Sequence, residues 1–196
     1  MIKACKKCRR EGDKLMLKGE RCFSAKCAMT RRPYVPGQHG PTSRTKLSEY
    51  GRQLREKQKI KRIFGLSEGD LSRVYREAER LSGNTAENII KIIESRMDNF
   101  IYRAGIGSSR SHARQIVSHA LVMLNGKKMS VPSAQVKPGD LITFYKSFKI
   151  DSKKIKPSPW IGFNDKNTSF EYLRQPSRED INLNINENLV VEYYSR

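Results

Sequence analysis

Residues 47–64 place apolar side chains at three- and four-residue steps, the spacing typical of an amphipathic helix. Ser48 is a suitable N-cap, and Gly65 follows Phe64 at the point where such a helix would stop. We therefore predict a long helix that begins at Ser48 and ends near Phe64. The residues expected on its inner stripe are Leu47, Tyr50 and Leu54.

A second helix is predicted over residues 68–82, with Ser67 as its cap and Gly83 at its end. A third begins at Asn84 or Thr85. Its apolar residues at helical steps are Ile89, Ile93, Met97, Phe100, Ile101 and Ala104. The pattern fits one continuous helix or two helices with a break near Ser95, and we read its apolar residues as core.

After residue 105 the pattern changes to a short helix and then to strands. Ser108 or Ser109 caps the helix, and Asn125-Gly126 is the strongest two-residue signal for a β-hairpin. The strands are predicted over residues 122–124, 127–131 and 141–145. The expected fold class is α+β: a helical domain, and a small domain of helices and a twisted antiparallel sheet.

Composition divides the chain into parts. The predicted parts are a basic arm over 1–44, a helical domain over 45–93, the helix-and-sheet domain over 94–150 and an irregular extension over 151–175. The tail, 176–196, is expected to pack near the helical domain, with Leu189-Val190-Val191 as a late strand or extended segment. No apolar run is long enough to span a membrane.

The charge of the chain is large and uneven. Its formal net charge is +19. Residues 1–62 carry 19 Lys and Arg against 5 Asp and Glu, a net charge of +14, whereas residues 63–196 carry 20 against 15, a net charge of +5. This concentration favours a polyanionic partner such as nucleic acid. An acidic membrane is the rival partner, but it requires an amphipathic helix with an aromatic or leucine face, or a lipidation signal, and neither is visible.

Four cysteines lie in the basic arm as two close pairs, Cys5 with Cys8 and Cys22 with Cys27. The spacing Cys-x-x-Cys, thirteen residues, Cys-x-x-x-x-Cys is typical of a structural zinc site with four thiolate ligands, which leaves no coordination position open for catalysis. The alternatives are free thiols or disulfides. Disulfides need an oxidising compartment, and no secretory signal precedes the first cysteine.

Two further segments carry candidate phosphate-binding groups. Residues 31–41 are rich in Pro and Gly, and they are either an RNA-contacting extension or an ordinary linker. In the predicted long helix, cations recur at steps of three and four: Arg52, Arg55, Lys59 and Arg62. We favour an RNA-binding face over a solvated one, because few acidic residues lie among these cations.

The sequence resembles a known family over nearly its whole length. Runs at 96–100, 102–103, 109–110, 113–119, 125–126, 132–133 and 136–140 closely resemble the RNA-binding domain named after small-subunit ribosomal protein four. Several RNA-modifying enzymes carry the same domain. Runs at 8–12, 17–22, 31–34, 36–40, 54–59 and 185–195 are similar to the bacterial-type ribosomal protein family itself.

The resemblance implies a structural constituent of the small ribosomal subunit, in a bacterial cytoplasm or an organelle. It implies that the protein binds the five-prime domain of the 16S-type ribosomal RNA early and so nucleates subunit assembly. It also implies ribosomal protein five as a neighbour, and a contribution to the messenger entry channel and to translational accuracy. No DNA or membrane partner and no enzymatic activity are expected.

Candidate site residues follow from the cation patterns and from the resemblance. The predicted zinc ligands are Cys5, Cys8, Cys22 and Cys27. The predicted RNA-binding residues are Arg9, Arg10, Arg21, Arg31, Arg32, Tyr34, Gln38, His39, Arg44, Lys46, Arg52, Arg55, Lys59, Arg62, Arg103, Arg110, Arg114, Gln115, His119, Asn125 and Lys127. The tail is acidic, which suits protein better than phosphate. Its predicted protein-contacting residues are Glu187, Glu192, Tyr193 and Tyr194.

Two other classes of function share part of this pattern. An RNA-modifying enzyme would use the same RNA-binding domain for targeting, but a catalytic domain normally needs well over a hundred residues, and no Ser/His/Asp or Cys/His nucleophile constellation is visible in the sequence. A zinc-finger DNA reader would need the ligand spacing of the classes that place a helix in the major groove, and the cysteines do not have it. Ribosomal RNA binding is therefore the prediction, with the RNA-modifying enzyme as the alternative.

Overall fold

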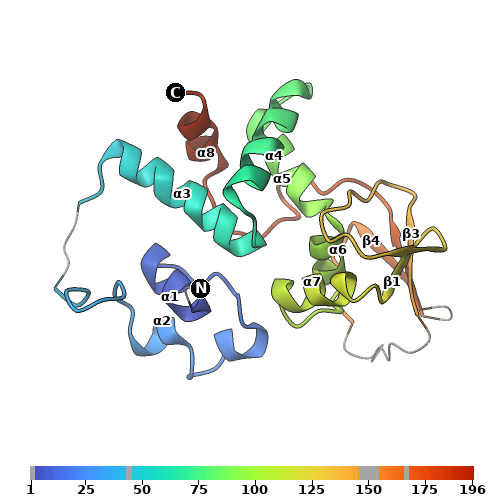
Figure 1. Ribbon diagram of the computed structural model, residues 1–196, viewed down its shortest axis with the longest axis horizontal. Coiled ribbons are helices and arrows are strands. Elements are labelled where there is room, and N and C mark those ends of the chain that lie inside the picture. Colours follow the sequence, from blue (N-terminus) through green and yellow to red (C-terminus); the bar gives the residue numbers. More distant parts are fainter. Residues whose placement is uncertain (1–2, 43–45, 146–154, 166–167) are drawn as a thin grey trace. The chain divides into compact units, whose positions relative to one another are not determined.

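The computed structural model describes residues 3–42, 46–145, 155–165 and 168–196 (Figure 1). The chain forms two compact units, residues 1–75 together with 184–196, and residues 76–183. The boundary between the two units lies within the predicted helical domain, 45–93. Each unit is described separately.

The first unit begins with short helices: α1 (Ala4–Glu11), the 3₁₀ helix η1 (Gly19–Cys22) and α2 (Ala28–Arg31). Gly12 ends α1 in the left-handed conformation, with φ of 74°. α1 packs against α2 and against the next helix. The arm is therefore a folded element.

Helix α3 (Glu49–Phe64) has the predicted caps. The Ser48 hydroxyl accepts a hydrogen bond from the Gly51 N–H at 3.2 Å, and Gly65 has φ of 65°. The predicted inner stripe is wrong at Leu47 and Tyr50, which are 46% and 48% exposed, whereas Leu54 is half-buried. The buried residues of α3 are instead Gln53, Lys57, Lys59, Ile60, Ile63 and Phe64.

The tail forms a helix, α8 (Glu187–Tyr194), so the predicted strand or extended segment is wrong. α8 lies along α3 (Figure 1). Val190 is fully buried, and the Tyr194 ring stacks on Tyr75 at a centroid distance of 4.9 Å. Val190 and Tyr194 are four residues apart, so a helix places both on the same covered face. A helix also pairs its backbone N–H and C=O groups internally, whereas a strand would need a neighbouring strand as partner. Polar groups of α3 are buried here because α8 supplies their partners: Gln53 donates to Glu192 at 3.0 Å.

Helix α4 (Glu68–Arg80) connects the two units. Ser67 and Asp70 form reciprocal capping bonds: the Ser67 hydroxyl accepts from the Asp70 N–H at 3.1 Å, and Asp70 accepts from the Ser67 N–H at 3.0 Å. The helix ends two residues before the predicted Ser82.

The second unit resolves the open question near Ser95. Helix α5 (Thr85–Glu94) stops there, and α6 (Met97–Arg103) starts after Arg96, whose ψ is 143°. The Ser95 carbonyl accepts from the Val136 N–H at 2.8 Å. The segment that contains Val136 thus occupies the Ser95 carbonyl, which in a continuous helix would accept a hydrogen bond from within the helix. Helix α7 (Arg110–Ser118) follows, capped by Ser109.

A five-stranded antiparallel sheet completes the second unit, in the order β2-β1-β3-β5-β4. The strands are β1 (Val122–Leu124), β2 (Lys127–Met129), β3 (Leu141–Phe144), β4 (Ile161–Asn164) and β5 (Ser169–Tyr172). Asn125 and Gly126 form the predicted hairpin turn, with φ of 49° and 77°. The α+β class is confirmed.

The prediction of an irregular extension over 151–175 is wrong, because β4 and β5 lie within it. Their aromatic residues complete the core of the unit. Trp160, Phe170 and Tyr172 are fully buried, and the Phe100 ring lies edge-on to Trp160 at 5.9 Å. The sheet therefore extends beyond the predicted domain end at residue 150.

Candidate nucleic-acid interface

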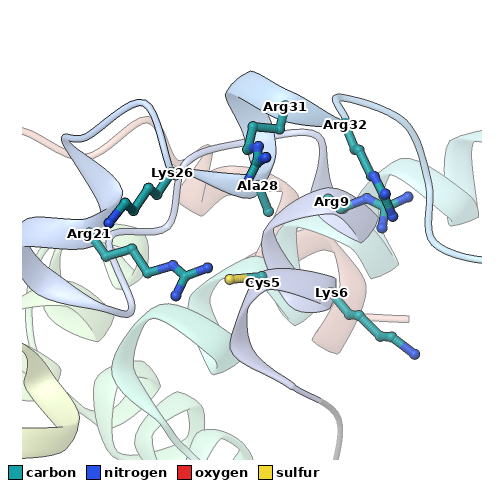
Figure 2. A pocket seen from close by; sticks show the side chains of 8 residues that line it. All are labelled: Cys5, Lys6, Arg9, Arg21, Lys26, Ala28, Arg31 and Arg32. Carbon is teal, nitrogen blue, oxygen red and sulfur yellow. The ribbon is translucent and has the colours of Figure 1, made fainter.

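An open cavity with a volume of about 460 Å³ lies on the basic arm. Its walls come from α1, η1, the loop after η1 and α2. The residues that line it are Cys5, Lys6, Arg9, Arg21, Lys26, Ala28, Arg31 and Arg32 (Figure 2). Six of these eight side chains are cationic, and none of the described lining residues is acidic. The arm cavity is thus a concave, strongly positive surface.

Arg9 is held in place by the loop after α2. Its Nε donates to the Tyr34 carbonyl at 2.9 Å, and a terminal nitrogen donates to the Val35 carbonyl at 3.4 Å. Its guanidinium also lies 4.7 Å from the centroid of the Tyr34 ring. The Tyr34 ring, a predicted RNA-binding group, thus makes a cation–π contact that positions Arg9.

The other five cations of the cavity are exposed. They are Lys6, Arg21, Lys26, Arg31 and Arg32. None of them takes part in the ion pairs that the structure records between described residues. Like charges gathered without counter-charges produce a positive potential that attracts anions.

The cations of α3 are placed differently, because three of the four are paired within the chain. Arg55 and Arg62 both contact the carboxylate of Glu11, Arg55 at 3.3 Å and Arg62 at a shorter distance. Lys59 pairs with Asp13 at 2.5 Å. The Glu11 side chain is only 1% exposed, and this burial raises its pKa although both arginines act in the opposite direction. This face of α3 is an internal ion-pair network with the arm.

Arg52, the fourth cation of that series, is exposed. With Arg10 it lines a second cavity of about 540 Å³. Val35, Leu47 and Leu189 supply apolar parts of its wall, and Glu11, Arg55 and Glu56 also line it. Arg10 and Arg52 are available to an external anion in a way that Arg55 and Arg62 are not.

The loop after α2 presents Gln38 and His39 as exposed side chains, and Lys46 is exposed before α3. Gly40 is required at its position, since an added Cβ would lie 1.8 Å from the Val35 carbonyl oxygen. The backbone of residues 35–40 therefore turns tightly. Arg44 lies outside the described residues.

In the second unit, two of the predicted RNA-binding arginines stabilise the interior. Arg103 binds the fully buried Glu94 with two nitrogens, at 2.9 Å and 2.5 Å. Arg110 donates to Asn99 at 2.9 Å, and its guanidinium lies 4.3 Å from the Tyr102 ring centroid. A bidentate ion pair with a buried carboxylate fixes the Arg103 guanidinium in the interior.

Arg114 is the cation of this group that reaches the surface. It donates to Asp98 at 2.9 Å, yet its side chain is 48% exposed. The same carboxylate also binds Arg96, which the sequence analysis did not single out. Gln115 and His119, on the same helix as Arg114, are exposed as well.

Asn125 and Lys127 belong to the hairpin. The Asn125 side chain donates to Asp140 at 2.8 Å and accepts from the Leu141 N–H at 2.8 Å, so it ties the turn to β3. Lys127 is exposed on β2, at the edge of the sheet. Of the two, Lys127 is the one free to meet a phosphate.

The four cysteines line one small cavity of about 20 Å³ in the arm. Cys8, Cys22 and Cys27 are buried, Cys5 is partly exposed, and all four are free thiols. Burial raises the pKa of the Cys8 thiol, and the other three cysteines act in the same direction. Within the described part of the chain, no three Cys, His, Asp or Glu side chains stand in the arrangement of a metal site. The structure thus shows four thiols gathered around one space.

The tail residues predicted to contact protein contact this chain. The Tyr193 ring lies 4.2 Å from the Lys57 Nζ, and the Tyr194 hydroxyl donates to Glu68 at 3.1 Å. Glu192 accepts from Gln53 on α3. Glu187 begins α8 and is half-buried.

Lys6 and Lys26 are cavity residues that the sequence analysis missed. Each is adjacent in sequence to a cysteine, Cys5 or Cys27. That adjacency was the available signal, because side chains next to clustered cysteines are brought together when the thiols gather.

Comparisons with known proteins agree on one family. A model described as the ribosomal protein S4/S9 N-terminal domain matches residues 2–94, and a model described as the S4 domain matches residues 95–142. The small ribosomal subunit protein uS4A of Clostridium perfringens is 48% identical over 199 residues, which cover 98% of this chain and 96% of that protein. The uS4 protein of Natranaerobius thermophilus is 44% identical, and the uS4A protein of Clostridium botulinum is 48% identical, with the same coverage of both chains. None of the helices in the described residues is long and apolar enough to cross a membrane. With relatives this similar over nearly its whole length, the chain belongs to the ribosomal protein uS4 family.

Proposed function

We propose that this protein is a structural constituent of the small ribosomal subunit that binds the 16S-type ribosomal RNA. Membership of the uS4 family over nearly the whole chain supports the assignment. The observation that carries it in the structure is the arm cavity, where six cations gather with no carboxylate among the described lining residues. Such a surface has the charge expected of a phosphate-binding site.

The RNA-binding surface that we infer is smaller than the full set of predicted residues. It consists of exposed cations and polar groups: the arm cavity, Arg10, Arg52, Gln38, His39, Lys46, Arg114, Gln115, His119 and Lys127. Arg55, Lys59, Arg62, Arg103 and Arg110 act indirectly, because they hold the shape of the two units through internal bonds. The role is binding rather than catalysis.

Zinc binding by Cys5, Cys8, Cys22 and Cys27 is part of this proposal. Its support is the donor set: four thiols from two close pairs that line a single cavity, which suits one structural zinc ion. The Lys18 N–H also donates to the Cys22 sulfur at 3.4 Å, which orients this side chain in the cluster. When bound, zinc would cross-link α1 to the segment that contains η1 and α2. A contact with ribosomal protein five, a position at the messenger entry channel and a role in accuracy stay predictions of the resemblance.

The experiment that tests the function is reconstitution with small-subunit RNA. The purified protein should bind folded 16S-type RNA and co-sediment with small subunits, and it should prefer that RNA to duplex DNA of equal length at the same salt concentration. Equal affinity for the two nucleic acids, together with failure to co-sediment, would contradict the proposal. An assay for RNA modification tests the enzyme alternative.

A further inference from the structure

We propose that Asn125-Gly126 is a site of spontaneous deamidation, and that the hydrogen bonds of the Asn125 carboxamide to Asp140 and Leu141 control the rate of the reaction. The site records, as an irreversible change of one amide to a carboxylate, that the hairpin between β1 and β2 has opened. The inference goes beyond the proposed function, because it involves neither RNA nor a partner protein.

The glycine after Asn125 permits this chemistry. In deamidation the backbone nitrogen of the following residue attacks the side-chain carbon of the carboxamide, and a side chain on that residue obstructs the approach. Asn125-Gly126 is the only Asn-Gly pair in the sequence. Both residues are exposed. In the described part of the chain, no heavy atom beyond the two neighbouring residues lies within 4 Å of the position that a Cβ of Gly126 would take. The reacting groups are therefore open to solvent.

The reaction needs water as its only co-reactant. The Gly126 nitrogen loses its proton and forms a bond to Cγ of Asn125, which closes a cyclic succinimide. The bond from Cγ to Nδ2 breaks, and ammonia leaves with that proton. Water then opens the ring at either of its two carbonyl groups, which yields aspartate or isoaspartate.

The fold restrains the carboxamide against this reaction. Nδ2 of Asn125 donates to Asp140 Oδ1 at 2.8 Å, and Oδ1 of Asn125 accepts from the Leu141 N–H at 2.8 Å. The Asn125 backbone N–H also donates to the Leu141 carbonyl at 2.8 Å. Ring closure rotates the carboxamide and expels Nδ2, so it requires both side-chain bonds to break. The folded hairpin is therefore protected although its sequence is reactive.

Asp140 is itself held in place. Its second carboxylate oxygen accepts from the Lys137 N–H at 2.7 Å, and its backbone carbonyl accepts from the N–H of Tyr172 on β5 at 3.1 Å. The acceptor for the Asn125 amide is thus fixed by the turn 136–140 and by the sheet. Because the acceptor is a carboxylate, the bond is charge-assisted and restrains the amide strongly.

The product of the reaction changes the hairpin. Aspartate at position 125 places a carboxylate against Asp140 where the parent has a donor, and like charges this close repel each other. Isoaspartate also lengthens the backbone by one carbon, in a two-residue turn that fixes the pairing of Leu124 with Lys127. Either product favours the open hairpin, so a modified chain does not regain the original turn.

Incubation of the full-length protein at mildly alkaline pH tests the inference. Peptide mass spectrometry measures the conversion of amide to acid at each asparagine, and an isoaspartate methyltransferase with S-adenosylmethionine detects isoaspartate. Asn125 should be converted before the other asparagines. In Asp140→Ala, which removes the acceptor, conversion should be about tenfold faster, as expected for the loss of one charge-assisted hydrogen bond. Asp140→Asn keeps one acceptor oxygen, so its rate should lie nearer to that of the parent.

Ile116→Val is the matched control, because it trims a buried side chain in the core of the same unit and leaves the hairpin unchanged. Its conversion rate should stay close to the parent rate. Equal acceleration in Ile116→Val and Asp140→Ala would show that unfolding of the whole unit sets the rate, and it would overturn the inference.

The parent protein in urea supplies the rate of the unrestrained pair. A folded parent that reacts as fast as the protein in urea would also overturn the inference, since the turn would then give no protection. The comparisons of the parent with urea and with Ile116→Val involve no change at Asp140, so they decide the question even where Asp140→Ala fails to fold. Amide exchange in the core of residues 76–183 shows whether that variant is folded.

Discussion

Two groups of cations in the first unit look equivalent in the sequence and differ in the structure. On α3, Arg55 and Arg62 share the buried carboxylate of Glu11. In the arm cavity, Arg21 and Arg31 are exposed, and no recorded ion pair between described residues involves them. Formal charge therefore does not identify a phosphate-binding surface: what matters is which cations the fold leaves without a carboxylate.

The contrast assigns different tasks to the two groups. The α3 cations connect the helix to the arm, and their loss should appear mainly as lost stability. The cavity cations repel one another in the free protein, and their loss should appear mainly as lost RNA affinity and a shallower salt dependence. The same distinction separates Arg103 from Arg114 in the second unit.

The largest expected effect comes from a change in the four-cysteine cluster of the arm. Cys22→Ser should abolish zinc binding, which contributes about 10–16 kcal/mol in structural zinc peptides. Residues 3–31 should then lose their ordered structure, and RNA affinity should fall, while the second unit stays folded. Metal analysis, amide exchange and RNA titration measure the three effects. Thr30→Ser is the control within the arm, and stoichiometric zinc or an ordered arm in Cys22→Ser would contradict the prediction.

The next largest effect is expected in the second unit, where one arginine variant should lose stability and another should lose RNA affinity. Arg103→Gln leaves the Glu94 carboxylate buried without its cation, so the free energy of unfolding should fall by about 3–5 kcal/mol. Arg114→Gln, at a side chain that is 48% exposed, should cost less than about 1 kcal/mol, but it should weaken RNA binding. Urea denaturation and RNA titration of both variants distinguish these outcomes. A small stability loss in Arg103→Gln would place that arginine with the RNA-binding residues.

A smaller effect is expected from the same comparison on α3. Arg55 is 23% exposed, so Arg55→Gln should lower the free energy of unfolding by about 2 kcal/mol, less than for a fully buried pair. Arg52→Gln, on the same helix, is the matched variant. It should leave stability within about 0.5 kcal/mol and make the salt slope of RNA binding shallower by roughly 0.7 to 0.9. Should Arg55→Gln change the slope as much as Arg52→Gln does, the internal role of the α3 network would have to be abandoned.

Much of the secondary structure could be predicted, because caps and turns are local. Ser48, Ser109 and Asn125-Gly126 act within a few residues of their own position, and each does what the sequence indicates. The tail helix was missed because the apolar run Leu189-Val190-Val191 suggests a strand. The helical spacing of Val190 and Tyr194 was the signal that an isolated three-residue run conceals.

The candidate site was less predictable, because its partners are distant in sequence. Glu11 pairs with Arg55 across 44 residues, and Gln53 bonds Glu192 across 139. No periodicity along the chain indicates such pairs. The strands β4 and β5 were missed for a related reason. β5 pairs with β3, which is distant in sequence, and β4 pairs with β5. Only the burial of Trp160 and Tyr172 shows why these strands belong to the sheet.

The smallest effect concerns Glu68, a carboxylate that neutralises cations of α3 near the tail. Its partial burial acts to raise its pKa, but hydrogen bonds from Lys57, Lys61 and Tyr194 outweigh burial and lower the pKa from 4.5 to about 2. Because the folded-state pKa is depressed, the stabilisation is complete above pH 4.5 and is lost as the pH falls toward 2. The Glu68 side chain is 49% exposed, so solvent screening should keep the contribution below about 1 kcal/mol.

Glu68→Gln should therefore be slightly less stable than the parent at pH 7, and the two proteins should converge in free energy of unfolding at pH 2. Urea denaturation at a series of pH values measures the difference, in which the acid sensitivity of the other carboxylates cancels. Glu77→Gln, an exposed position on the same helix, should give no pH-dependent difference. Since Glu68 binds Lys57 and the Tyr194 hydroxyl together, docking of α8 on α3 should weaken over the same pH interval. A constant difference from pH 7 to pH 2 would mean that Glu68 contributes through packing rather than through its charge.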